Sequence, residues 1–216
     1  MKFNNTNCIF FAFILTCLFA CNNSSTEKKE NNVQTDKPIK KDTPVVEKKK
    51  ITEEKPPSII NITDTLSKKL TVLYMKDSAA TRERITLKLS KIYNGKLAGI
   101  IKKNGLKVSG PPMAWYSTKK APFYFEAGIP VEKKTGKIPS NVFTRQIAVD
   151  SVLVAHFYGK YDQLPQAYEA LSDILKSRKK ALQGKPYEIY VDDPMDKDGK
   201  PKNPYKVQTD VVFPWR

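Results

Sequence analysis

Cysteine and histidine are scarce in this sequence of 216 residues. Its 3 cysteines all fall within the first 21 positions, and its one histidine is His156. Disulfide frameworks need pairs of cysteines, and structural zinc sites use four Cys or His ligands. We therefore predict no disulfide and no metal site in the body of the protein, and we expect no cofactor.

Two familiar motifs of functional sites are also missing from the sequence. It contains no Gly-x-Ser-x-Gly segment, and one histidine provides only a single candidate base for a nucleophilic triad. The aspartate-rich loop at 193–201 lacks the closing glutamate and the ligand spacing of a calcium-binding loop. We predict neither a triad nor a calcium site.

Long apolar runs are absent as well. A membrane-spanning helix needs about 20 consecutive apolar residues; the run at residues 9–20 is shorter and follows Lys2, as in a secretion signal. It ends in Leu18-Phe19-Ala20-Cys21, which resembles a bacterial lipobox. That resemblance implies cleavage before Cys21, acylation of its thiol, as by palmitate, and a membrane-anchored lipoprotein of the cell envelope. The alternative is an uncleaved amino-terminal anchor.

The segment after Cys21 has the composition of a spacer. It is mostly Asn, Ser, Thr, Lys, Glu and Pro, and residues 22–57 hold 9 basic and 7 acidic side chains that nearly cancel. Such a segment cannot bury enough apolar surface to offset the entropy lost on ordering. We predict three parts: a signal peptide at 1–20, a lipidated Cys21 with a disordered spacer at 21–57, and one folded domain at 58–216.

The predicted domain is strongly basic, with 28 Lys and Arg against 15 Asp and Glu. In a cytoplasmic protein this balance would indicate nucleic acid. The export signal argues against that, and the lysines are scattered rather than clustered. We interpret the charge as a solvated basic surface that suits anionic lipid, and we expect no nucleic-acid partner.

The domain also contains an internal repeat with an offset of 74 residues. The segment Gly110-Pro111-Pro112-Met113-Ala114-Trp115-Tyr116 is matched by Gly184-Lys185-Pro186-Tyr187-Glu188-Ile189-Tyr190, and helical patterns at 80–103 and 164–182 precede the two copies. We therefore predict an α+β fold of duplicated β-α-β-β units with pseudo-twofold symmetry. Its antiparallel sheet would have helices on one face and a ligand cleft on the other.

Strand parity assigns side chains to these two faces, because side chains alternate with period two along a strand. In the last strand, Val211 and Phe213 are expected to face the helices. The same rule sends five residues to the open face: Glu188, Tyr190, Tyr116, Tyr124 and Glu126. A face that gathers tyrosines and carboxylates from both halves is our candidate ligand cleft.

Residues from about 66 to 216 resemble the GyrI-like small-molecule-binding domain, the effector-binding module of AraC- and MerR-type multidrug regulators. Four segments carry the likeness: Phe157-Tyr158-Gly159-Lys160-Tyr161, the stretch at 184–190, Asp193-Pro194, and Thr209-Asp210-Val211-Val212-Phe213-Pro214. No DNA-binding helix-turn-helix accompanies them, and the lipobox precedes them. This departure puts both transcriptional regulation and gyrase inhibition in doubt.

The resemblance implies a function for the cleft. Family members bind lipophilic, often cationic, compounds among aromatic side chains, with a buried glutamate at the position of Glu188 as counter-ion. Tyr124 and Tyr158 also match aromatic cleft positions. A carboxylate among rings is poorly solvated until a cation arrives, and each ring attracts that cation by about 0.5–2 kcal/mol. We therefore predict a small lipophilic, cationic or aromatic molecule as the partner, and we assign no catalytic residue.

Three other interpretations stay open. Some GyrI-like proteins hydrolyse reactive electrophiles, and Glu188 with Tyr190 or Tyr116 could act as general base and general acid. The open face could instead dock another protein. Finally, Glu188 could be a solvated carboxylate on an exposed sheet.

Overall fold

The computed structural model describes residues 56–118, 120–133, 136 and 138–216. The predicted signal peptide, Cys21 and nearly all of the spacer lie outside the described residues, so these assignments and the domain boundaries stay predictions. No helix in the described ranges is both long enough and apolar enough to cross a membrane.

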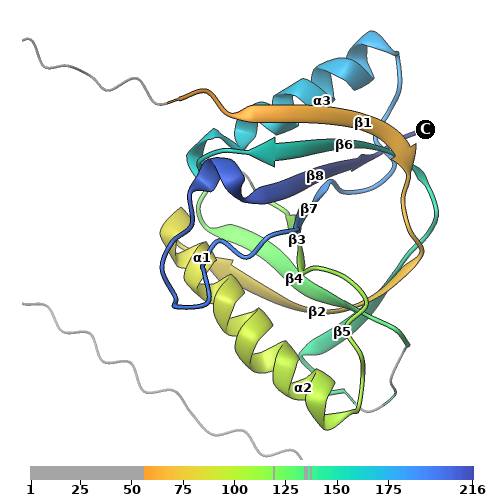
Figure 1. The fold of residues 1–216 in the computed structure, drawn as a ribbon. Helices are drawn as coiled ribbons and strands as arrows, with labels where there is room; N and C mark the ends of the chain where they lie inside the picture. Colours follow the sequence, from red (N-terminus) through yellow and green to blue (C-terminus); the bar gives the residue numbers. More distant parts are fainter. Residues whose placement is uncertain (1–55, 119, 134–135, 137) are drawn as a thin grey trace, which may run out of the picture. The chain divides into compact units, whose positions relative to one another are not determined.

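Within the described residues, eight strands form one antiparallel sheet, in the order β1-β6-β8-β7-β3-β4-β2-β5 (Figure 1). The predicted α+β class is confirmed. The strands are β1 (Ile59–Leu66), β2 (Leu70–Ala79), β3 (Met113–Tyr116), β4 (Phe123–Val131), β5 (Val142–Ile147), β6 (Ser151–Tyr158), β7 (Tyr187–Tyr190) and β8 (Gln208–Pro214). The helical elements are α1 (Arg82–Ser90), η1 (Lys91–Leu97), α2 (Ala98–Lys103), η2 (Tyr161–Gln163), α3 (Pro165–Ser177) and η3 (Pro204–Lys206).

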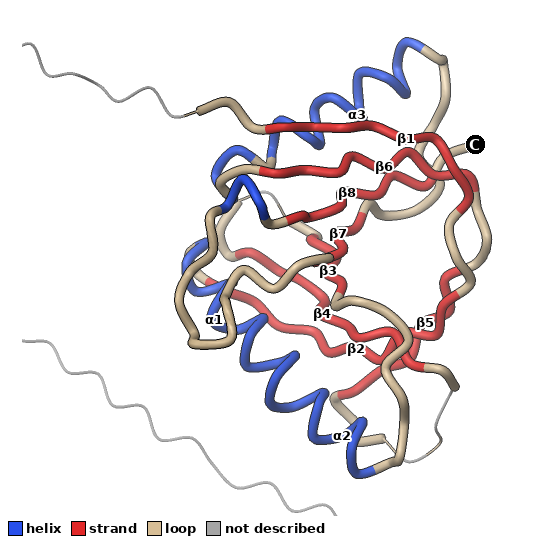
Figure 2. The backbone as a smooth tube through the Cα atoms, in the orientation of Figure 1, coloured by secondary structure: helices blue, strands red, loops and turns tan. Residues whose placement is uncertain are grey.

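The strand order reflects the sequence repeat. The two repeated segments form β3 and β7, which pair with each other at the centre of the sheet (Figure 2). From this pair outward the order is β4-β2-β5 on one side and β8-β6-β1 on the other. The duplicated halves therefore meet along β3 and β7.

The helical elements α1, η1 and α2 form one continuous segment beside the first half. The Thr81 hydroxyl caps its beginning by accepting a hydrogen bond from the backbone N–H of Arg84. Its buried stripe includes Ile85, Leu89, Ile92, Leu97 and Ile101. The segment continues through η1, a π-helical turn that includes Asn94 and Gly95, and it ends before Gly105, whose positive φ of 58° suits a helix stop.

Helix α3 packs on the sheet in the second half. It is shorter than the predicted range of 164–182. Pro165 occupies its first turn, where the missing N–H is harmless, and Ala167, Leu171 and Leu175 are buried. The helix ends at Ser177, because Lys179 adopts a left-handed conformation with φ of 54°.

Both faces of the sheet contain buried apolar clusters. On the helix face, Leu73 and Phe125 pack with the residues of α1–α2, while Leu153 and Val211 pack with those of α3. The opposite face has its own apolar cluster, which is built of strand residues: Val72, Met113, Trp115, Val152, Val154, Tyr187 and Val212. Apolar alternation therefore cannot by itself identify the face that carries the helices.

The predicted faces of Glu188, Tyr190 and Tyr116 are wrong. Strand β7 pairs with β8 so that Glu188 lies directly opposite Val211, and directly paired residues share a face. Val211 packs under α3, as predicted, so Glu188 and Tyr190 lie on the helix face; Tyr116 packs against the core under α1–α2. The prediction failed because Tyr187, the residue directly before Glu188, is buried on the opposite face.

Candidate functional site

The Glu188 carboxylate is buried between the two halves of the helix face, with the residue 3% exposed. Three phenol hydroxyls donate hydrogen bonds to it. Tyr168 of α3 reaches Oε1 at 2.8 Å, whereas Tyr161 of η2 and Tyr190 of β7 reach Oε2 at 2.7 and 2.8 Å. Both carboxylate oxygens are therefore satisfied by neutral donors.

Tyr116 extends this network into the first half of the domain. Its hydroxyl lies 2.8 Å from that of Tyr190 and 3.2 Å from that of Tyr161. We call Tyr116, Tyr161, Tyr168 and Tyr190 the tyrosine cluster. Its rings and the single carboxylate come from β3, η2, α3 and β7.

Local sequence explains how Tyr161 reaches the carboxylate. The chain leaves β6 and turns at Gly159, where an added Cβ would lie 2.8 Å from Ser58 Cβ and 2.9 Å from the ring of Phe157. A side chain at this position would therefore collide with its neighbours. The tight turn leads directly into η2, whose first residue is Tyr161.

The electrostatics of the cluster depend on burial. Burial raises the pKa of the Glu188 carboxyl, and the hydrogen bonds from Tyr161, Tyr168 and Tyr190 offset that rise only in part. Burial, and then the negative charge of Glu188, raise the pKa of all four phenols in the cluster. The phenols therefore stay protonated and act as donors.

Among the described residues no Lys or Arg forms an ion pair with Glu188, and the Arg82 guanidinium is the weakest of the influences that lower its pKa. No group of three or more His, Cys, Asp or Glu side chains in the described part of the chain could hold a metal ion. The charge of Glu188 is thus compensated mainly by hydrogen bonds, with a smaller contribution from the Arg82 guanidinium.

The other predicted site residues lie elsewhere. Glu126 is on the opposite face, where it pairs with Arg145 at 2.5 Å; the Arg145 guanidinium also lies 4.5 Å from the Trp115 ring. Tyr124 is half exposed and, by alternation with buried Phe125, faces away from the helices. The Tyr158 hydroxyl donates to Gln208 at 2.6 Å. The structure therefore does not bring Tyr124, Glu126 or Tyr158 to Glu188.

Two residues of the cluster were absent from the predicted site. Tyr161 closes the Phe157–Tyr161 motif, and Tyr168 belongs to the stripe of α3 that packs on the sheet. A tyrosine in such a stripe usually completes a core. Only the three-dimensional approach of α3 to β7 identifies its hydroxyl as a donor to Glu188.

One family model, described as GyrI-like small molecule binding domain, matches residues 78–216. That range is more than half of the chain and includes Glu188 and the whole tyrosine cluster. A search of the curated proteins finds no match.

Solved structures share the fold. The crystal structure of the EcmrR C-terminal domain aligns with a TM-score of 0.59 and 17% identity, over 74% of this chain and 98% of that one. EcmrR in a DNA complex aligns with a TM-score of 0.58 and 16% identity over 74% of this chain, which spans only 57% of that regulator. A hydrolase from Listeria innocua aligns at 0.49 and 11% identity, over 72% and 91% of the two chains. Identities this low show the fold alone.

Proposed function

Because the chain belongs to the family of GyrI-like small molecule binding domains, we propose that it binds a small lipophilic cation, with Glu188 as the counter-ion. The observation that supports this most strongly is a buried carboxylate held by three neutral phenols and by no cation among the described residues. Nucleic acid is not part of the proposal.

An ionised carboxylate in an apolar site is unfavourable unless it is paired and hydrogen-bonded. A positively charged ligand would supply the missing charge, and the faces of the tyrosine rings would attract it by about 0.5–2 kcal/mol each. Glu188 would select charge, while the rings would tolerate ligands of different shape.

Access to the carboxylate would depend on Tyr161. This residue is 43% exposed, yet its hydroxyl points inward to Glu188. It lies in η2, a helical element of three residues between β6 and α3. We propose that Tyr161 moves outward when a ligand enters and that the ligand then takes over its contact with Oε2.

Hydrolysis is the second candidate function, and one observation favours it. A carboxyl with a raised pKa beside protonated phenols has the composition of a general base with a general acid. Under this alternative, Glu188→Gln would abolish turnover of a reactive electrophile, such as an aryl epoxide, while cation binding changed little. Loss of cation binding in the same variant would instead support the counter-ion.

We also propose that the domain is tethered at the cell envelope through Cys21, on the basis of the lipobox-like segment alone. An envelope location would place the domain where lipophilic cations arrive from outside the cell.

Thermal unfolding of the full-length protein tests the proposed ligand class. A ligand that binds only the folded state raises the melting temperature according to its concentration and affinity. We expect octylammonium to raise it more than octan-1-ol at equal concentration, because the two share an alkyl chain and differ in charge. The absence of any shift with octylammonium would contradict binding of a cation.

A further inference from the structure

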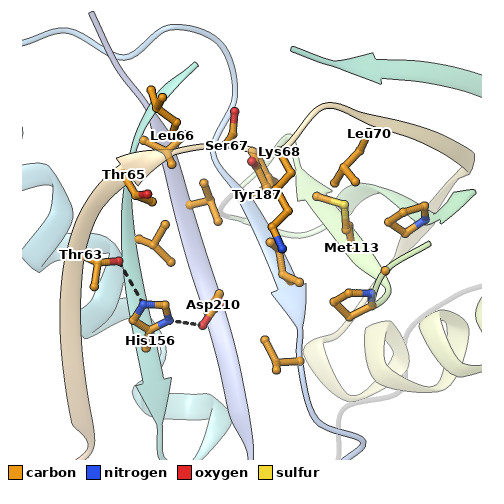
Figure 3. A pocket seen from close by; sticks show the side chains of 18 of the residues that line it. Thr63, Thr65, Leu66, Ser67, Lys68, Leu70, Met113, His156, Tyr187 and Asp210 are labelled. Atoms are coloured by element: carbon orange, nitrogen blue, oxygen red, sulfur yellow. Dashed lines mark hydrogen bonds and ion pairs between the residues drawn. The ribbon is translucent and has the colours of Figure 1, made fainter. Parts of the chain in front are cut away.

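The sheet face opposite the helices contains a cavity of about 300 Å³ (Figure 3). Apolar side chains from both halves form most of its wall: Met113, Pro130, Val152, Val154, Ile189 and Val212. Cavities that bind small molecules begin at about this volume and are mostly apolar, with a few polar groups that orient the ligand.

This cavity is separate from the tyrosine cluster. Neither Glu188 nor any of the four clustered tyrosines lines it. Strand β7 lies between the two sites, with Tyr187 and Ile189 facing the cavity and Glu188 and Tyr190 facing the cluster. A ligand in the cavity would therefore contact a different face of the same strand.

The polar groups on one wall of the cavity already have partners. Asp210 Oδ1 lies 2.8 Å from His156 Nδ1 and accepts a hydrogen bond from Gln208 at 2.8 Å. The other ring nitrogen of His156, Nε2, lies 3.1 Å from the Thr63 hydroxyl (Figure 3). These groups form a cross-strand ladder over β1, β6 and β8. The Asp210 carboxylate therefore already has hydrogen-bond partners and needs no cation from a ligand.

Lys68, unlike Asp210, is a charged side chain of the cavity wall that has no partner among the described residues. It is exposed, lies in the turn between β1 and β2, and lines the cavity. It forms no hydrogen bond or ion pair with any residue that the structure describes. Its ammonium group is therefore free to pair with an anion at the rim of an apolar cavity.

We propose that this cavity binds a small lipophilic anion, an alkyl carboxylate in chemical class, with its chain among the apolar residues and its carboxylate at Lys68. Burial of the alkyl chain would supply most of the affinity, because the removal of apolar surface from water is favourable. The lysine would supply the preference for negative charge. The proposal is independent of the proposed function, because the two sites have no ligand-contacting residue in common.

Calorimetric titration of the full-length protein with octanoate, octan-1-ol and octylammonium tests this inference. Octanoate should bind the wild type and the Glu188→Gln variant equally well. Lys68→Gln should weaken the binding of octanoate by about two- to fivefold, since the ion pair is partly exposed, and should leave the binding of octan-1-ol unchanged. The matched control is Lys69→Gln, because Lys69 is also exposed but does not line the cavity; it should bind octanoate like the wild type.

A second variant tests the location of the alkyl chain. Val154→Phe places a larger side chain against the cavity and should weaken both octanoate and octan-1-ol, while a wild-type melting temperature would show that the fold is kept. The inference is overturned if octanoate does not bind the wild type, if Lys68→Gln and Lys69→Gln reduce its binding equally, or if Glu188→Gln abolishes it. None of these results bears on octylammonium at Glu188, so the two proposals fail separately.

Discussion

The hydroxyls of Tyr116 and Tyr190 lie 2.8 Å apart, and the two residues are 74 positions apart in the chain. That interval is the offset of the sequence repeat, so the hydrogen bond joins equivalent positions of the two halves. Two positions earlier in each copy, Ala114 pairs directly with Glu188 across β3 and β7. The symmetric scaffold therefore brings two tyrosines together but has a carboxylate in only one half, which leaves one negative charge at the junction.

The hydrogen bond from Tyr168 to Glu188 should be worth more when the carboxylate is ionised. Hydrogen bonds to charged groups contribute about 1.5–3 kcal/mol, and neutral ones about 0.5–1.5 kcal/mol. Tyr168→Phe should therefore lower the free energy of unfolding by more at high pH than at low pH, measured by urea titration from about pH 4 to about pH 9. Tyr158→Phe is the control, because its hydroxyl donates to the neutral amide of Gln208. Equal pH dependence in both variants would refute a special role for Tyr168.

The raised pKa of Glu188 has a consequence for stability. Glu188 holds its proton more tightly in the folded state, so its contribution is fully present below the unfolded-state pKa of about 4.3 and is lost as pH rises through the higher folded-state value. The glutamine in Glu188→Gln cannot ionise. The melting temperature of this variant should therefore rise relative to that of the wild type as pH rises. Glu169→Gln changes an exposed glutamate on α3 and should show no such trend. A constant difference between Glu188→Gln and the wild type would mean that the pKa is not raised.

Cation binding should itself depend on pH. Only ionised Glu188 pairs with a cation, and alkylammonium ions stay charged up to about pH 10. The affinity for octylammonium should therefore increase as pH rises through the raised pKa of Glu188, and binding below that pKa should release a proton. Calorimetry in two buffers of different ionisation enthalpy measures the proton released. Affinity that is flat or falls over this range would argue against pairing with Glu188.

The envelope tether has its own test in cells. Cys21→Ser in the full-length chain should move the protein from the membrane fraction to the soluble fraction and abolish labelling with palmitate. The control is Cys17→Ser, which changes a cysteine inside the predicted signal peptide and should affect neither property. A Cys21→Ser protein that still sediments with membranes and still incorporates palmitate would disprove lipidation at this position.

Local patterns predicted much of this fold. The repeat at 110–116 and 184–190 indicated the duplication, and the helical patterns at 80–103 and 164–182 indicated the helical segments of the two halves. These features depend on residues close together in the chain, which is why the sequence alone was sufficient.

Long-range pairing was harder to predict. Strands β5 and β6 are separated by residues 148–150 only, yet β5 pairs with β2, and β6 pairs with β1 and β8. The sequence suggested one kinked strand or two short ones and could not place them at different ends of the sheet. The predicted face of Glu188 was wrong because it also depends on long-range pairing, namely the register of β7 against β8.

Comparison of octylammonium and octan-1-ol binding to wild type, Glu188→Gln and Glu169→Gln tests the central claim most directly. Loss of the buried charge at Glu188 should weaken the binding of octylammonium by about ten- to a hundredfold, which is the range for one interaction with a charged group. The alcohol should change by less than about threefold, because ring contacts and apolar burial remain. Glu169→Gln should bind both compounds like the wild type. If Glu188→Gln instead binds octylammonium as tightly as the wild type does, Glu188 is not the counter-ion and the proposed site is wrong.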